Sequence, residues 1–148
     1  MTENHQYNIE INAQYIKDMS FESPASPFSL LQSEAPQINL DVNLDIQRLD
    51  QKNFEVILKI EATAKSPEND QVIFIVTLDY AGVFDMNEIP EEYYENLLVV
   101  YCPTLLFPYS RSIMSNIVRD GGFPPLMLKP IDFSALYKKD QADSSQVQ

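Results

Sequence analysis

Apolar and polar residues alternate along the first part of the chain. From Tyr7 to Phe21 the odd positions are mostly apolar and the even positions mostly polar. A period of two is typical of a β-strand with one buried face. We therefore predict a strand over residues 7–22, which the proline-containing run 23–27 ends because proline lacks a ladder donor. Its last outward-facing side chains are Asp18, Ser20 and Glu22.

Two further stretches alternate in the same way. Apolar residues occupy every second position from Ile38 to Ile46 and again from Phe54 to Ala64. The connecting segments 50–53 and 66–70 are rich in the Asp, Asn, Ser and Pro residues that favour turns. We predict a strand over each stretch, with apolar side chains inward and polar side chains outward.

A fourth stretch, residues 71–84, is apolar on both sides. The inward positions are Val72, Phe74, Val76, Leu78 and Tyr80. Alternation leaves Ile73 and Ile75 on the outer face, although antiparallel sheets usually keep one face polar. Two interpretations are open. The two isoleucines are scattered surface residues, which are common, or they belong to an apolar docking patch ringed by Asp18, Glu22 and Asp79.

The second half of the chain has helical spacing. Pro90, followed by two glutamates, fits the first turn of a helix. A longer helix is expected to begin between Leu105 and Pro108, because proline is tolerated outside a helix or in its first turn. Its apolar side includes Ile113 and Ile117, and Gly121 and Gly122 should end it.

The segment after this helix carries three prolines in FPPLMLKP, residues 123–130. Such a run cannot hold regular structure for long, so we predict an extended arm. Asp132 is then a candidate N-cap for a last short helix.

These elements predict an α+β fold: a four-stranded antiparallel meander sheet with helices packed on one face. We expect a single domain over residues 1–148, with a flexible polar tail after about residue 139. The predicted helices are short relative to the apolar face of the sheet. The edge strand is long, and an unprotected edge invites pairing with another copy. The chain is therefore expected to form a homo-oligomer.

Composition and net charge limit the classes of partner that the chain is expected to bind. The formal net charge of -12 repels phosphate backbones and anionic headgroups, so nucleic acid and membrane surfaces are disfavoured and a basic polypeptide is favoured. The N-terminus lacks the pattern of a secretory signal. The apolar run 97–109 contains two prolines and is too short to span a bilayer. A single cysteine suits a reducing cytoplasm.

The residues needed for catalysis are scarce. The one histidine, His5, lies near a terminus, and the three glycines form no phosphate-binding loop. Cys102 lacks a nearby histidine and precedes a proline in an apolar run, which predicts a buried structural thiol. The carboxylates alternate onto a solvated face, where they are poor acid/base catalysts. We expect neither an enzyme nor a bound cofactor or metal.

Four segments together resemble the SecB family of bacterial protein-export chaperones, over roughly residues 12–137. They are QYIKDMSFESP (14–24), YAGVF (80–84), YCPTLLFPYSR (101–111) and GGFPPLMLKPIDFSALY (121–137). The resemblance implies a cytoplasmic homotetramer, a dimer of dimers, that binds unfolded preproteins and delivers them to the SecA ATPase. It implies no nucleotide and no membrane insertion.

The resemblance also implies roles for particular residues. SecA contacts correspond to Asp18, Glu22 and Ile75, with one departure: Thr77 occupies a position that is commonly acidic in the family, so a weaker acidic surface is expected. The residues expected to affect assembly are Val76, Leu78 and Tyr80, with Ile113 and Ile117 of the long helix. The candidates for the preprotein groove, which could equally be ordinary core, are Phe28, Phe74, Tyr109, Leu126, Leu128 and Phe133.

Two other functions remain open from the sequence. A SecB-like chaperone could serve a single partner such as an antitoxin, although Asp18 and Glu22 favour export. A helix on an antiparallel sheet could also enclose an apolar small molecule, although the serine-rich helix and the proline arm suit assembly better.

Overall fold

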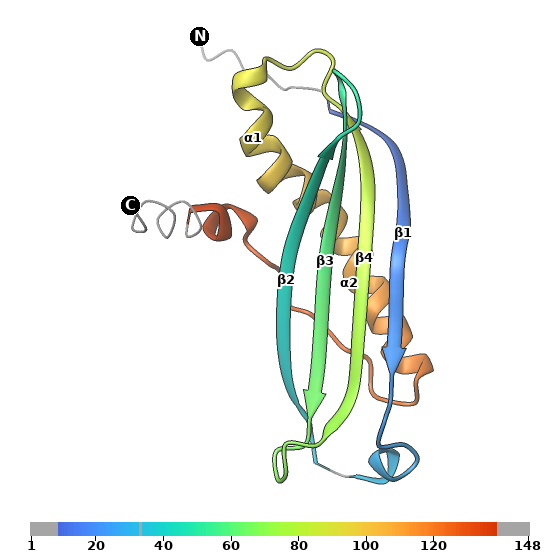
Figure 1. The fold of residues 1–148 in the computed structure, drawn as a ribbon. Coiled ribbons are helices and arrows are strands. Elements are labelled where there is room, and N and C mark those ends of the chain that lie inside the picture. The colour runs from blue at the N-terminus through green and yellow to red at the C-terminus, as the bar shows by residue number, and fades with distance from the viewer. Residues whose placement is uncertain (1–8, 33, 139–148) are drawn as a thin grey trace.

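The alternating stretches form four long antiparallel strands in the computed structural model, which describes residues 9–32 and 34–138. The strands are β1 (Glu10–Glu22), β2 (Gln37–Arg48), β3 (Asn53–Lys65) and β4 (Val72–Asp85). A long helix crosses one face of the sheet (Figure 1), so the predicted α+β class is confirmed. The predicted strand start at Tyr7, His5 and the polar tail after residue 139 lie outside the described residues.

The order of the strands differs from a simple meander. The sheet has the order β1-β4-β3-β2, so only β2, β3 and β4 follow one another and β1 pairs with β4. A hairpin between β1 and β2 would need a loop of about two to five residues. The linker 23–36 is much longer and contains a 3₁₀ helix, η1 (Phe28–Leu31), which carries the chain from one edge of the sheet to the other. Both β1 and β2 are therefore edge strands.

The two predicted helices are joined into one segment. The first begins directly after Pro90, as predicted, whereas the second begins earlier than predicted. The segment runs without a break through η2 (Glu91–Tyr93), α1 (Tyr94–Asn96), a π-helical turn (Leu97–Tyr101) and α2 (Cys102–Asp120). The predicted start near residue 105 is wrong, because Pro103 lies in the first turn of α2 and Pro108 lies inside it. The amide of Cys102 donates to the carbonyl of Leu97, five residues back. This wider π turn offers the backbone adjustment that a nearby proline requires.

The sheet and α2 share one core. The inward side chains of β3 are buried as predicted, and so are Phe74, Val76, Leu78 and Tyr80 of β4. Val72, also predicted inward, is half-buried opposite Lys65, because the pairing shifts next to it. The buried side chains form one cluster with Leu106 and Met114 of α2. By length and composition alone, residues 91–120 could also cross a membrane, which the two prolines had argued against. In this structure α2 packs instead on β3 and β4, leaving the inner side of β2 only partly covered.

Strand β1 contains two bulges that the alternation did not reveal. The pairing with β4 skips one residue between Ile11 and Ala13 and another between Ile16 and Asp18. Each bulge reverses the face of the residues that follow it. Tyr15 was predicted inward but lies on the outer face, where its hydroxyl bonds Glu55 of β3. After the second bulge the original register returns, so Asp18 and Glu22 face outward as predicted.

A third irregularity corrects the prediction for Ile73. The pairing of β3 with β4 shifts between Ala64 and Lys65, which pair with Phe74 and Val72, so Ile73 is the extra residue. Its side chain is 4% exposed and is part of the core cluster. The proposed outer pair of isoleucines is therefore reduced to Ile75.

Candidate functional site

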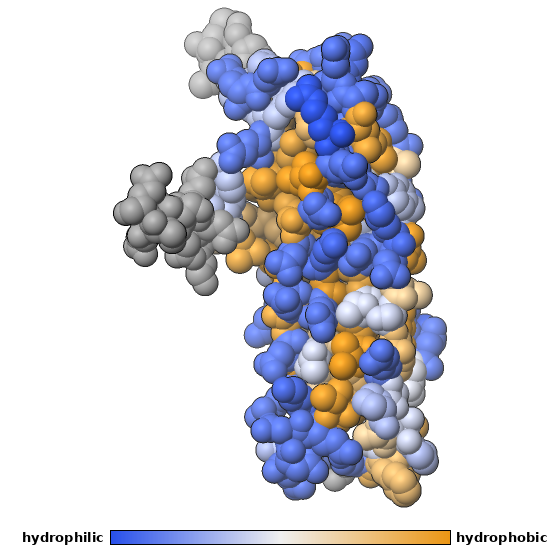
Figure 2. Space-filling view, viewed as in Figure 1, coloured by the Kyte–Doolittle hydropathy of each residue, from blue (hydrophilic) through white to orange (hydrophobic). Residues whose placement is uncertain are grey.

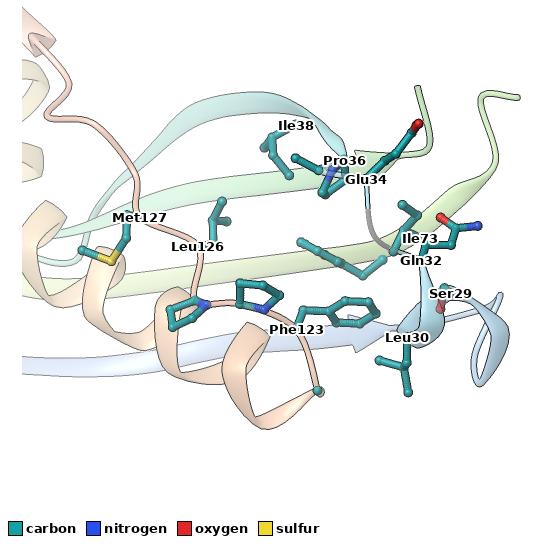
Figure 3. A pocket seen from close by; sticks show the side chains of 15 residues that line it. Ser29, Leu30, Gln32, Glu34, Pro36, Ile38, Ile73, Phe123, Leu126 and Met127 are labelled. Carbon is teal, nitrogen blue, oxygen red and sulfur yellow. The ribbon is translucent and has the colours of Figure 1, made fainter. Parts of the chain in front are cut away.

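An open groove lies between the proline-rich arm and the start of β2. We call it the arm groove; its volume is about 420 Å³. Figure 3 shows Phe123 and Leu126 of the arm on one side, Ile38 of β2 on another and η1 at one end. The full lining is Ser29, Leu30, Gln32, Glu34, Ala35, Pro36, Ile38, Ile73, Phe74, Gly122, Phe123, Pro124, Pro125, Leu126 and Met127.

The turn that ends α2 sets the position of the arm. Gly122 has a φ of 98°, a left-handed conformation that favours glycine. A Cβ on Gly121 would overlap the ring of Phe21, so this glycine allows β1 to pack against the helix end. Phe123 then packs between two rings, with centroid distances of 6.4 Å to Phe21 and 5.1 Å to Phe74. This aromatic cluster anchors the arm beside the sheet, while Pro124 and Pro125 keep the chain extended.

A second groove lies at the other end of the arm. We call it the β2 groove; its volume is about 520 Å³. It is lined by Val42, Asn43, Leu44, Ile46, Val99, Phe133, Leu136 and Tyr137. The carboxylate of Asp132 accepts a hydrogen bond from the amide of Ala135 at 3.1 Å, which confirms the predicted N-cap of the last helix, residues 133–138. In Figure 2 hydrophobic surface is visible beside β2, between the long helical segment and this last helix.

The six residues predicted for the preprotein groove do not form one site. Phe74 and Leu126 line the arm groove, and Phe133 lines the β2 groove. Leu128 is buried in the core. Tyr109 lines neither groove; it is half exposed on α2, with its ring stacked on that of Tyr80 at 6.0 Å.

Phe28 is 76% exposed on η1 and lines neither groove. Sequence reasoning missed Leu30, Ile38, Ile73 and Phe123 as lining residues of the arm groove. Ile38 carried a partial signal, since alternation placed it inward on a sheet whose apolar face the predicted helices were too short to cover. Its position on an edge strand depends on the observed strand order, which the sequence did not reveal. Ile73 carried none, because its orientation depends on the bulge.

The residues predicted to contact SecA do come together on the outer face. Glu22 lies directly opposite Ile75 and Asp18 opposite Asp79 across the β1–β4 pair. Between them the hydroxyls of Ser20 and Thr77 share a hydrogen bond. Figure 2, which looks onto this face, shows hydrophilic side chains spread over the strands.

Two carboxylates of this face, Asp18 and Glu22, lack a basic partner in the described part of the chain. Lys59 approaches Asp79 at 4.0 Å, whereas Asp18 and Glu22 make no salt bridge within residues 9–32 and 34–138. The row from Asp18 to Glu22 is therefore acidic, exposed and bordered by one apolar side chain.

Apolar side chains are also exposed on the helix side of β1. Ile16 and Met19 are 46% and 45% exposed, and Tyr109 of α2 is 52% exposed. Ile113 and Ile117, predicted to lie at a subunit interface, are half-buried on α2 and pack against the core. The side of α2 next to β1 thus leaves apolar surface uncovered beside an unpaired strand edge.

Titratable groups offer little for catalysis in the described part of the chain. Burial raises the pKa of the Cys102 thiol to about 12, so it is inert at neutral pH, as predicted. No group of three or more His, Cys, Asp or Glu side chains in that part is arranged to hold a metal ion. A sheet with one helical layer, an open apolar groove, a second groove of mixed lining and an acidic outer face is typical of proteins that bind other chains.

Comparison with known proteins identifies the family. A family model described as preprotein translocase subunit SecB matches residues 2–144. A protein-export protein SecB from a Bradyrhizobium strain is 48% identical over 133 residues, covering 89% of this chain and 81% of the relative. The SecB protein of Rickettsia akari is 46% identical over 138 residues, covering 92% and 90%. The chain belongs to the SecB family of protein-export chaperones.

A solved structure shows the same fold. It is a Mycobacterium tuberculosis SecB-like chaperone in complex with a peptide from the HigA1 antitoxin. Its TM-score is 0.67 at 16% identity, with coverage of 84% of this chain and 91% of that one.

Proposed function

We propose that this protein binds extended segments of unfolded preproteins in the cytoplasm and delivers them to SecA, acting as a binding protein without catalysis. The observation that carries the proposal is the open, mostly apolar arm groove, with a second groove of mixed polar and apolar lining at the other end of the arm. Water-exposed apolar lining of this kind is stabilised when an apolar chain segment covers it. Folded proteins have buried such segments and offer little to bind.

The chemistry of the arm groove suits varied sequences. Met127, 71% exposed at its rim, is flexible and polarisable, and Phe123 and Phe74 provide aromatic surface. The net charge of -12 favours basic segments and speeds their encounter at low salt. Selectivity then rests on exposed hydrophobicity and charge, which unfolded preproteins share, rather than on one sequence.

For delivery, we propose that SecA docks on the outer face at Asp18, Glu22 and Ile75. The carboxylates are exposed and make no salt bridge with residues 9–32 and 34–138, so a basic surface can approach them at little desolvation cost. Thr77 adds no charge and bonds Ser20 instead, which leaves the docking row less acidic than a carboxylate there would make it.

For assembly, we propose a homotetramer in which copies meet along β1 and α2. Ile16, Met19 and Tyr109 supply uncovered apolar surface beside the free edge of β1. Beneath this region lie the buried side chains of Val76, Leu78 and Tyr80, which would affect assembly by stabilising the surface above them. Ile113 and Ile117, half-buried on α2, would contribute to the interface from the helix.

Two measurements test the proposal. A reduced preprotein diluted from urea should refold more slowly in the presence of the chaperone, and light scattering should show a complex of tetramer and client. A monomer that leaves the refolding rate unchanged would refute the chaperone function.

Docking is tested by replacing Asp18→Ala together with Glu22→Ala. Exposed charge pairs are worth up to about 1 kcal/mol each, so SecA affinity should fall roughly tenfold. The matched control is Asp41→Ala with Asp45→Ala, which removes the same charge from the outer side of β2 at the opposite edge. An equal loss in both variants would show that only net charge matters. Client capture without measurable SecA binding would indicate a chaperone dedicated to another partner.

A further inference from the structure

A polar cluster on the outer face of the sheet is not explained by client binding or by docking. Glu55 of β3 is 7% exposed, although it lies on the face that alternation assigns to solvent. Its carboxylate accepts a hydrogen bond from the hydroxyl of Tyr15 and another from the ammonium of Lys17 at 2.8 Å. Both donors come from β1, and β4 lies between the two strands.

The side chain of Tyr15 therefore crosses β4 to reach its partner. Tyr15 pairs with Ala81 of β4, and Ala81 pairs with Ile57 of β3. Both of these outer-face residues are buried, at 0% and 5% exposed. The small Ala81 leaves room for the aromatic ring above it.

The two hydrogen bonds to Glu55 come from Tyr15 and from Lys17, which lies at the second bulge of β1. Pairing advances from Ile16 opposite Tyr80 to Asp18 opposite Asp79, so Lys17 is the extra residue. Because Tyr15 and Lys17 are both held outward, Ile16 between them must point to the helix side. There it joins Met19 and Tyr109 in the exposed apolar surface described above.

The amino-acid pattern favours a different register for this segment. Odd positions from Tyr7 to Phe21 are mostly apolar, so a strand without bulges would place Ala13 and Tyr15 inward and Ile16 outward. Residues from Asp18 onward would keep their face in either register. A contact outside β1 must therefore select the observed arrangement of residues 13–16. Positions where the structure departs from the local sequence pattern are often functional.

We propose that Glu55 is a positioning residue for self-assembly: by holding Tyr15 and Lys17 on the outer face, it places Ile16 on the surface that meets a second copy of this chain. The inference rests on the proposed homotetramer. The electrostatics are consistent with it. Hydrogen bonds from Lys17 and then Tyr15 lower the pKa of Glu55, so it is ionised at neutral pH. Burial, followed by the hydrogen bond to Glu55, raises the pKa of Tyr15 to about 12, so its donor proton is retained.

Two engineered cysteine pairs report the register directly. Ala13→Cys with Val83→Cys joins directly paired outer-face positions within the segment that can shift. Ser20→Cys with Thr77→Cys joins paired positions beyond the bulge, where the register does not depend on Glu55. Copper phenanthroline oxidises each thiol pair to a disulfide, and the native Cys102 is buried and inert.

The perturbation is Glu55→Leu, with Glu61→Gln as the matched control from the exposed side of the same strand. Glu55→Leu removes the acceptor of both hydrogen bonds, from Tyr15 and from Lys17, so the 13–83 cross-link should slow roughly tenfold or more. The 20–77 cross-link should stay unchanged, and light scattering should show tetramer converting to smaller species. Glu61→Gln should leave all three measurements unchanged.

An unchanged 13–83 cross-linking rate in Glu55→Leu overturns the register role. A slowed cross-link with tetramer mass retained overturns the assembly role. If Glu55→Leu does not fold, Tyr15→Phe with Lys17→Met removes both donors instead, and an unchanged 13–83 cross-link there also overturns the proposal. A monomeric wild-type protein would refute the tetramer, while the cross-links would still decide whether Glu55 sets the register.

Discussion

Truncating two side chains of the arm groove tests whether clients are held there. Ile38 and Met127 project from β2 and from the arm (Figure 3), and 38% and 71% of their surfaces are exposed. Fully burying a side chain of this kind is worth about 1.5–3 kcal/mol. Scaled by the exposed fractions, Ile38→Ala with Met127→Ala should cost about 2 kcal/mol of binding, or roughly a thirtyfold rise in the client Kd.

The assay is fluorescence anisotropy of a labelled, reduced preprotein segment that cannot fold. Leu49→Ala is the control, because Leu49 is 50% exposed in the β2–β3 turn and lines neither groove. Thermal unfolding should be nearly unchanged in both variants, since neither groove residue belongs to the core cluster. A Kd within twofold of wild type would refute client binding in the arm groove, and an equal rise in Leu49→Ala would show that general surface hydrophobicity is being measured.

Three further predictions concern the scaffold. Gly121→Ala should lower the free energy of unfolding by about 1–3 kcal/mol, read from denaturant titration, because the new methyl overlaps the ring of Phe21; wild-type stability would contradict this packing. Cys102 should react with a thiol reagent at pH 8 only after unfolding, and fast labelling of the native protein would contradict its burial. Tyr15 should titrate near pH 12 in ultraviolet absorbance. Because folding raises the pKa of Tyr15, its contribution to stability is complete below about pH 10 and is lost as the pH rises through 12. A wild-type Tyr15 that titrates near pH 10 would contradict the hydrogen bond, and so would a Glu55→Gln variant in which the pKa of Tyr15 does not decrease.

Much of the fold could be predicted because the relevant signals are local. Alternation determined β2 and β3 almost to the residue, since the inward and outward faces of a strand follow directly from its side-chain period. The Asp132 cap and the Gly121–Gly122 turn are also local, because they depend on side-chain and backbone chemistry within a few residues.

The candidate site was predicted in part. The outward placement of Asp18, Glu22 and Ile75 followed from alternation, whereas only Phe74, Leu126 and Phe133 among the predicted groove residues line a groove. Apolar residues of the core and of an open groove look alike in a sequence. The difference is whether another element covers them, and that depends on where α2 and the arm lie.

The sequence by itself therefore determined the strands, the α+β class, the acidic character, the buried thiol and the family resemblance. Tertiary structure decided the strand order, the continuous helix through Pro103 and Pro108, and the faces of Tyr15, Ile16 and Ile73. The physical reason is the distance along the chain between the residues that determine each feature. A side-chain period is a property of consecutive residues, but a bulge is selected by partners far away in the chain, as Glu55 is from Tyr15.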